Sequence, residues 1–399
     1  MNQNMGRLWV ALLAATALLI GSTALADHRS GNTVLIGGAI SQTGRYAEPA
    51  TRQYNSVKMW VDEVNRRGGL LGHKVELLML DDKSETQTAI KLYEKLITED
   101  KVDVVMAPYS SGITDAVANV TERYKMPMVA YGAASLDIWE RGRKYIFGVN
   151  DIAENYQKGA AHLAKQIGVK RIAIIGEDSL FPRMSRKGLE QWAKELGLEV
   201  VVAENYSTQK QGDYTALLQK IRAQRVEAIF SNSYFDDAAA QIRQLREMNY
   251  DLKIFASTVG PGLPRFAKEL GPTAEYVLGF SQWEPKPGLG FPGMAEFIAN
   301  YKDRYGDEPN YHSGSAYASM QITEAAIKRA GSFDREKVRD VLATIEVNTM
   351  FGTYKADARG LSAHEGLTFQ IFKGERMVVW PTRLAEIKPV LPMPKWSER

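Results

Sequence analysis

The sequence predicts an α/β protein with two doubly wound parallel-sheet lobes. Short apolar runs alternate with amphipathic stretches of helical length, and the alternation begins again near residue 152. Parallel strands need crossover helices, so two such series indicate two lobes. A stretch rich in proline and glycine, 284–293, ends the second series, and helical and extended segments follow it.

The first series opens with the apolar run 33–38, which ends in Gly37-Gly38 and is typical of a buried parallel strand. Gly68-Gly69 then ends an amphipathic stretch, as glycine commonly does after a helix. On these patterns we expect strands at 33–38, 75–80, 102–107 and 128–130, and helices at 53–67, 86–99 and 114–124.

The second series repeats this alternation, and the segments after it do not. We expect strands at 171–175, 199–203, 228–230, 253–256 and 276–280, and helices at 183–196, 214–222 and 236–248. Beyond the proline- and glycine-rich stretch we expect helices at 294–305, 316–330 and 336–344, then extended chain at 353–371 and 377–380.

Composition excludes several functions. The 399 residues include 50 Lys and Arg against 47 Asp and Glu, a net charge of +3, so no basic stripe supports nucleic-acid binding. The chain has no cysteine, which excludes disulfide scaffolds, thiolate zinc sites and cysteine nucleophiles.

The N-terminus has the layout of a secretory signal peptide. A short segment with Arg7 precedes the apolar run 8–20, and Ala24-Leu25-Ala26 follows as a cleavage pattern. The apolar run is too short for a hydrocarbon core of about 30 Å, which argues against a membrane anchor. We expect cleavage after Ala26 and a periplasmic protein.

The best-equipped strand end for a ligand is the turn 108–112. Ser110 and Ser111 stand where a helix begins, so hydroxyls, free N–H groups and a positive helix dipole converge on one point. Such a site suits a carboxylate, although plain helix capping would use the same residues.

Two further patterns occur at predicted strand ends. The small residues 132–135 would let a ligand approach the backbone closely, or form an ordinary tight turn. Tyr46, Phe181 and Tyr234 follow strands of both series. Together these aromatic residues would line a cleft suited to an organic ligand, although each alone is more often a packing residue.

These elements, in this order, resemble the type I periplasmic binding proteins of the leucine/isoleucine/valine-binding family, the soluble receptors of ABC importers. The resemblance covers about residues 32–385. The pieces that carry it are Ile40–Gly44, Asn65–Gly72, Asp81-Asp82, Pro108–Gly112, Gly132–Ser135 and Tyr317.

The resemblance implies two lobes joined by three chain crossings, near 149–152, 279–283 and 350–353. It therefore implies these divisions: a signal peptide at 1–26, lobe one at 32–150 plus 282–350, lobe two at 151–280 plus 353–385, and a C-terminal tail at 386–399.

The resemblance also implies a ligand site between the lobes. Matching positions for holding a ligand carboxylate are Ser110, Ser111, Ala133 and Ser135. Matching aromatic contacts are Tyr46, Phe181 and Tyr234, with Trp283 as a wall near a crossing.

The sequence departs from the family at one important position. Amino-acid receptors of the family place an acid after the strand that is 253–256 here, to pair with the ligand's ammonium, but Ser257–Gly260 contains none. Because a buried, unpaired ammonium is costly, either Asp236 or Asp237 replaces that acid or the ligand lacks the ammonium. Both aspartates also suit the first turn of a helix. Branched-chain amino acids, and aromatic or aliphatic carboxylates or amides, all remain open.

An enzyme is the weaker hypothesis. The sequence has no G-x-S-x-G, H-E-x-x-H, Walker or dinucleotide pattern, and its five histidines lack metal-ligand spacing. We expect no catalytic residue, metal or cofactor, a monomer, and ABC importer permease subunits as partners. A sensor that signals to a membrane protein would use the same fold.

Overall fold

Two parallel sheets organise the chain in a computed structural model, which describes residues 32–207, 212–286, 290–362 and 364–399. These residues belong to one compact unit, Asn32–Arg399, and the expected signal peptide lies outside the described residues. None of the described helices combines the length and apolar character needed to cross a membrane.

Lobe one is built on a three-stranded parallel sheet in the order β2-β1-β3, with a separate parallel pair formed by β4 and β5. The strands are β1 (Thr33–Ile40), β2 (Lys74–Asp81), β3 (Val104–Val105), β4 (Met128–Ala130) and β5 (Ile146–Gly148). The helices between them are α1 (Ala47–Arg66), α2 (Thr86–Thr98), α3 (Ser111–Arg123) and α4 (Asp137–Glu140).

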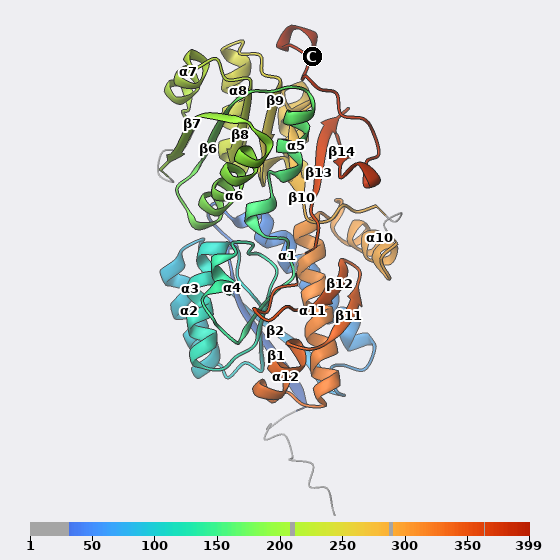
Figure 1. Ribbon diagram of the computed structural model, residues 1–399. Helices are drawn as coiled ribbons and strands as arrows, with labels where there is room; N and C mark the ends of the chain where they lie inside the picture. The colour runs from blue at the N-terminus through green and yellow to red at the C-terminus, as the bar shows by residue number, and fades with distance from the viewer. Residues whose placement is uncertain (1–31, 208–211, 287–289, 363) are drawn as a thin grey trace, which may run out of the picture. The chain divides into compact units, whose positions relative to one another are not determined.

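Lobe two contains a seven-stranded sheet in the order β14-β13-β10-β9-β8-β6-β7. Its strands are β6 (Arg171–Glu177), β7 (Glu199–Tyr206), β8 (Ala228–Asn232), β9 (Ile254–Ser257), β10 (Leu278–Ser281), β13 (Leu367–Phe372) and β14 (Glu375–Trp380). Strands β6 to β10 pair in parallel, whereas β13 pairs antiparallel with both β10 and β14. In Figure 1 the two red strands from the C-terminal part thus complete a sheet begun by green and yellow ones.

Helices cover both faces of this second sheet. They are α5 (Lys158–Gln166), α6 (Leu180–Leu196), α7 (Thr215–Ala223), α8 (Phe235–Glu247) and α9 (Pro264–Leu270). Along β6, Ile172 and Ile174 face one apolar core, and Ala173 and Ile175 face another. The alternation follows from the two-residue period of a strand, and it gives this sheet a doubly wound arrangement.

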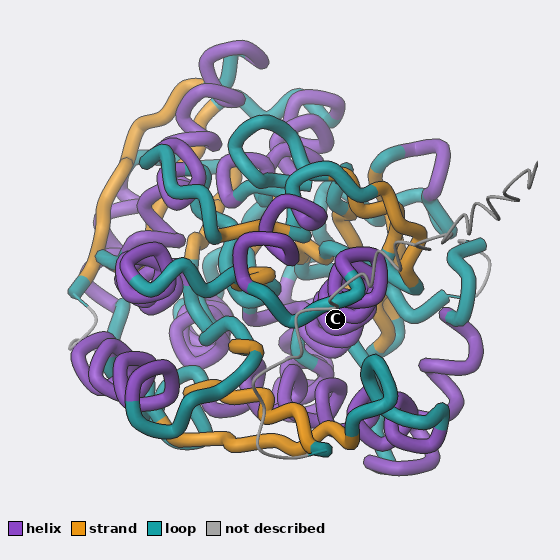
Figure 2. The backbone as a smooth tube through the Cα atoms, turned by 90° about the horizontal axis from the view of Figure 1, so that it is seen from below, coloured by secondary structure: helices purple, strands orange, loops and turns teal. Residues whose placement is uncertain are grey.

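The chain returns to lobe one after β10. The returning elements are α10 (Met294–Tyr305), α11 (Tyr311–Ala330), α12 (Arg335–Leu342), β11 (Glu346–Thr349) and β12 (Gly352–Lys355). Helix α11 packs against α1, and the Trp60 indole N–H donates to Glu324 at 2.9 Å. Short 3₁₀ turns occur at Ala153–Asn155, Gly260–Gly262, Gly271–Ala274, Thr382–Leu384 and Trp396–Glu398. Figure 2 shows helices on more than one side of the strands.

The expected fold class is confirmed, and the last crossing lies later than the sequence indicates. Strand β12 pairs antiparallel with β11, and Leu361 forms a bridge with Gly148 of β5. Residues 353–361 therefore stay with lobe one, and the third crossing falls between Ser362 and Leu367 instead of near 350–353. An extended segment alone does not reveal which strand it will pair with.

Four helices also begin at least three residues earlier than predicted. Helices α1, α3, α6 and α11 start at Ala47, Ser111, Leu180 and Tyr311 instead of residues 53, 114, 183 and 316. The start of α11 has a clear cause, because the Asn310 side chain accepts hydrogen bonds from the N–H groups of His312 and Ser313.

Candidate functional site

A cavity lies beyond the carboxyl ends of strands from both lobes. Its empty volume is about 300 Å³, including its opening to solvent. Segments that follow β3, β4, β6, β8 and β9 contribute to its walls. This is where ligands bind in open parallel sheets.

The structure brings together five of the expected site residues and adds six others with functional groups. The expected residues that line the cavity are Ser110, Ser111, Ala133, Phe181 and Tyr234. The unexpected ones are Tyr109, Tyr131, Asn150, Tyr156, Tyr311 and His312.

Two serine hydroxyls at the start of α3 differ in their bonding. The Ser111 hydroxyl accepts the N–H groups of Ala134 at 3.1 Å and Ser135 at 3.2 Å, joining the turn after β3 to the turn after β4. A hydroxyl has one proton and two lone pairs, so Ser111 still has a proton to donate. Ser110 is the N-cap residue, but its side chain makes no capping bond. Its hydroxyl is therefore available to a ligand.

The Tyr109 hydroxyl is oriented by His312. Because Asn310 uses its oxygen to cap α11, its Nδ2 faces the His312 Nδ1 at 3.3 Å, and that ring nitrogen must accept. The proton of the neutral imidazole then lies on Nε2, which is 3.2 Å from the Tyr109 hydroxyl. Burial, assisted by the charge of Arg52, holds the pKa of His312 well below its usual value. Tyr109 thus accepts from a neutral histidine and has its own proton to donate.

Aromatic rings form an apolar wall opposite these donors. Tyr156 stacks on Phe280 with centroids 3.8 Å apart and meets Phe181 edge-on at 4.9 Å. Phe181 in turn lies 6.0 Å from Tyr234. This wall would contact the hydrocarbon part of an organic ligand.

The cavity lining contains no charged side chain among the residues that the structure describes. Asn150 is 3% exposed, and its Nδ2 donates to the Tyr131 carbonyl at 2.9 Å. That bond fixes the orientation of the carboxamide and leaves Oδ1 as a buried acceptor without a partner. The site therefore combines several hydroxyl donors with one unpaired amide acceptor.

Three expected residues lie outside this lining. Tyr46 packs behind it, with its ring 5.5 Å from Tyr109 and 5.0 Å from Tyr234. Ser135 supplies only its backbone N–H to Ser111, while its hydroxyl is buried without a partner. Trp283 packs between Phe297 and Phe351 near the second crossing. In this structure none of these three residues forms the surface of the cavity.

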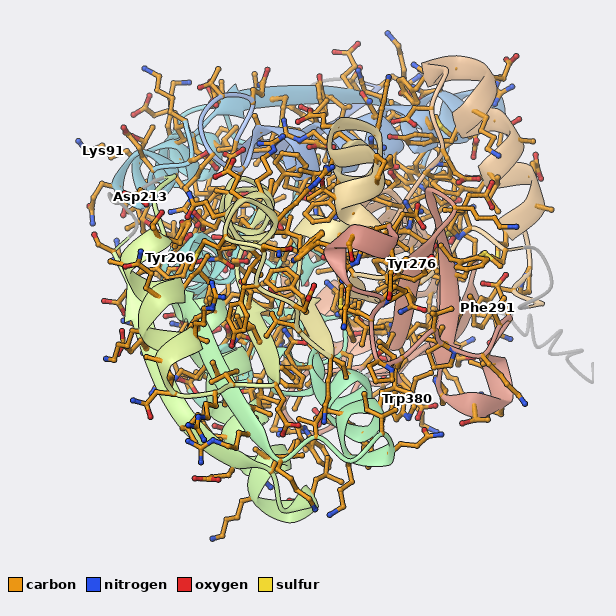
Figure 3. The ribbon with its side chains drawn as sticks, turned by 90° about the horizontal axis from the view of Figure 1, so that it is seen from above. Lys91, Tyr206, Asp213, Tyr276, Phe291 and Trp380 are labelled. Atoms are coloured by element: carbon orange, nitrogen blue, oxygen red, sulfur yellow. The ribbon has the colours of Figure 1, made fainter. Side chains whose placement is uncertain are left out.

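Neither of the expected ammonium partners reaches the cavity in the described structure. Asp236 is exposed and pairs with Arg265 at 3.3 Å. Asp237 accepts a hydrogen bond from the Tyr214 hydroxyl. The Tyr214 ring packs edge-on against Tyr206, which ends β7 and is labelled in Figure 3. Burial raises the pKa of the Asp237 carboxyl. Both aspartates lie in the first turn of α8, where their charge favours the helix.

Ion pairs join the two lobes beside the cavity. Arg45, which follows β1, pairs with the fully buried Glu177 at the end of β6. The Arg45 guanidinium lies 5.3 Å from the Tyr234 ring centroid. On the other side, Arg265 pairs with Glu48 of α1 at 2.6 Å. Both ion pairs link a residue of lobe one to a residue of lobe two.

Four of the six residues that the sequence did not reveal come from segments without a motif. Asn150 lies in the first crossing, Tyr156 follows the 3₁₀ turn Ala153–Asn155, and Tyr311 and His312 begin α11. Asn310 is the one local signal, because asparagine favours the N-cap of a helix. Nothing in the local sequence indicates that this helix end faces the cavity.

Two parallel-sheet lobes with a small buried cavity between their strand ends define a two-lobed solute-binding protein. Comparison with known proteins agrees. The periplasmic binding protein family model matches residues 33–374. A Leu/Ile/Val-binding protein homolog of Brucella melitensis is 26% identical over 393 residues, covering 94% of this chain and 96% of that protein. The chain belongs to the periplasmic binding protein family.

Solved structures share the fold. The branched-chain amino acid substrate-binding protein LivJ of Streptococcus pneumoniae, in complex with isoleucine, has a TM-score of 0.78 at 22% identity, covering 86% of this chain and 97% of that one. A solute-binding protein of Rhodopseudomonas palustris, in complex with benzoate, has a TM-score of 0.77 at 16% identity, covering 87% and 95%. The expected family and fold are thereby confirmed.

Proposed function

We propose that this protein is the exported receptor of an ABC importer and not an enzyme. It binds one small carboxylate-bearing solute between its lobes and delivers it to the permease subunits. The observation that carries the proposal is the set of hydroxyl donors at the start of α3, facing a cavity without acidic residues.

The donor groups near the start of α3 are of the kind that holds a carboxylate. Tyr109 and Ser111 each accept from protein groups and keep a proton to donate, and Ser110 makes no capping bond. The first N–H groups of α3 and the helix dipole add positive potential at the same point. Acceptor oxygens bound to such groups form charge-assisted hydrogen bonds.

A branched-chain or related amino acid is our first ligand candidate. The names of the Brucella relative and of the isoleucine-bound LivJ support it. In this cavity the ammonium would bond to the Asn150 Oδ1 and to neutral oxygens, because Asp236 and Asp237 do not line it.

An aromatic or aliphatic carboxylate is the second candidate, favoured by the absence of any charged side chain in the described lining. Such a ligand carries no cation that needs an acidic partner, so it avoids the cost of a buried, unpaired ammonium. The benzoate complex of the Rhodopseudomonas palustris protein supports this class.

A thermal-shift screen separates the candidates. L-leucine, L-isoleucine, benzoate and 3,4-dihydroxybenzoate are the probes, and Ser110→Ala is the control variant. A specific ligand at a hundred times its Kd stabilises the protein by about 2.7 kcal/mol, and the gain should shrink in the variant. Stabilisation by neutral sugars or polyamines alone would contradict the carboxylate site.

Export and closure have separate tests. N-terminal sequencing of the exported protein should begin at Asp27, and an intact Met1 on soluble protein would contradict export. Solution scattering should give a smaller radius of gyration with a stabilising probe, because a ligand held by both lobes favours the closed state. An unchanged radius at saturation would contradict closure around the ligand.

A further inference from the structure

The side chain of Gln282 connects two of the three chain crossings. Its Oε1 accepts the Asp151 N–H at 2.9 Å, and its Nε2 donates to the Asp151 carbonyl at 3.1 Å. Gln282 lies in the second crossing and Asp151 in the first, so the carboxamide pairs with the backbone as a neighbouring strand would. Gln282 is 2% exposed, which shields these bonds from water.

The same carboxamide also reaches the cavity wall. Its Nε2 donates to the Tyr156 hydroxyl at 2.9 Å, and Tyr156 lines the cavity. Phe280 stacks on the Tyr156 ring and Phe181 meets it edge-on, so the ring is held by apolar contacts. Gln282 then fixes the Tyr156 hydroxyl. Both protons of the carboxamide nitrogen are used, one on the backbone and one on the cavity wall.

The third crossing joins the same cluster. His364 Nε2 lies 2.9 Å from the Gln282 carbonyl, and the Gly366 N–H donates to the Asp151 carboxylate at 3.3 Å. A change of angle between the lobes must move these three segments relative to one another. Such a movement would strain the bonds of Gln282 and with them the position of Tyr156.

We propose that Gln282 is a positioning residue of the ligand cavity: it holds Tyr156 at the wall and couples that wall to the angle between the three crossings. Ligand contact with Tyr156 and closure of the lobes then depend on one another. The coupling rests on the proposed function only in that the ligand occupies this cavity.

The test compares Gln282→Met with a matched control, Gln370→Met. Gln370 is also buried, donates to the carbonyls of Tyr276 and Val390, and accepts the Val390 N–H. None of these residues lines the cavity. Tyr156→Phe breaks the same bond from the other end and keeps the ring, so it provides a second variant with little risk of misfolding.

The first measurement needs no ligand. In protein labelled with ¹³C in its tyrosine rings, Tyr156→Phe assigns the Tyr156 resonance. Gln282→Met should shift or broaden that resonance, and Gln370→Met should leave it unchanged even if its melting temperature falls by as much. An unchanged Tyr156 resonance in folded Gln282→Met would overturn the proposal, whichever probes bind.

The second measurement titrates benzoate and L-isoleucine. For a probe that binds, Gln282→Met and Tyr156→Phe should each raise its Kd about tenfold, or 1.4 kcal/mol, and the double variant by no more than about tenfold. Additive losses, or an equal loss in Gln370→Met, would contradict the coupling. Failure of both probes on the unmodified protein would count against the ligand class and leave the resonance test decisive for Gln282.

Discussion

Ser110 and Ser111 are neighbours with different roles, and replacing each with alanine separates binding from stability. Ser111→Ala removes the acceptor of two buried N–H groups, those of Ala134 and Ser135. Each buried donor without a partner costs about 1–3 kcal/mol, so unfolding should become easier by roughly 2–6 kcal/mol, at the low end if water enters. Ser110→Ala removes no side-chain capping bond, so the free energy of unfolding should change by less than about 0.5 kcal/mol.

Both substitutions should weaken binding. A hydrogen bond to a charged group contributes about 1.5–3 kcal/mol, which corresponds to roughly a 10- to 150-fold rise in Kd. Urea unfolding without ligand gives the stability, and calorimetric titration with the strongest probe from the screen gives the Kd. Equal destabilisation by the two variants, or binding that survives in both, would refute the assignment of donors at α3.

Three further predictions concern charge and packing. Because the pKa of His312 is lowered in the folded state, the unfolded state takes up a proton first, and stability is lost as the pH falls below about 6.5. His312→Gln should flatten this part of the plot of melting temperature against pH. An unaltered slope would contradict the burial of His312 as a neutral group. Glu177→Gln removes the partner of Arg45 in the other lobe. With saturating probe, solution scattering should therefore give the variant a larger radius of gyration than the unmodified protein. Equal radii would mean that the ion pair does not hold the closed form. A Cβ at Gly188 would lie 2.1 Å from a carbonyl oxygen of the 3₁₀ turn Ala153–Asn155, so Gly188→Ala should destabilise the protein by about 1–3 kcal/mol. A Cβ at Gly112 would meet open space, so Gly112→Ala should be neutral or stabilising. Urea unfolding measures both effects, and equal effects would contradict the packing around Gly188.

The sequence predicts the central strands of the larger sheet well because these strands are buried on both faces. A continuous apolar run such as 172–175 is typical of a strand with an apolar core on each side, and β6 has this arrangement. The segment 353–361 carries no such constraint. Its pairing with β11 and Gly148 depends on the tertiary structure, so the sequence does not locate the third crossing.

The candidate site is predictable only at strand ends. Ser110, Ser111 and Ala133 follow strands directly, and parallel strands bring their carboxyl ends to one edge. Asn150, Tyr156 and His312 reach the same cavity from the first crossing, the 3₁₀ turn after it and a helix start, where the local sequence does not indicate which way a side chain points. Tyr46 and Trp283 are large aromatic residues near the cavity, but side-chain packing turns them away from its surface.

The interleaving of the two lobes along the chain has a consequence for biosynthesis. Lobe one needs Leu361 for its bridge to Gly148, and the sheet of lobe two needs β13 and β14, which end at Trp380. Neither lobe can therefore be completed by an N-terminal fragment emerging from the ribosome. Pairings between segments so distant in sequence also form slowly, because the loop-closure entropy precedes the gain from contact. We therefore expect a chain whose lobes are incomplete before Leu361 and Trp380 to remain unfolded for longer during synthesis, which would favour its passage through a secretion channel.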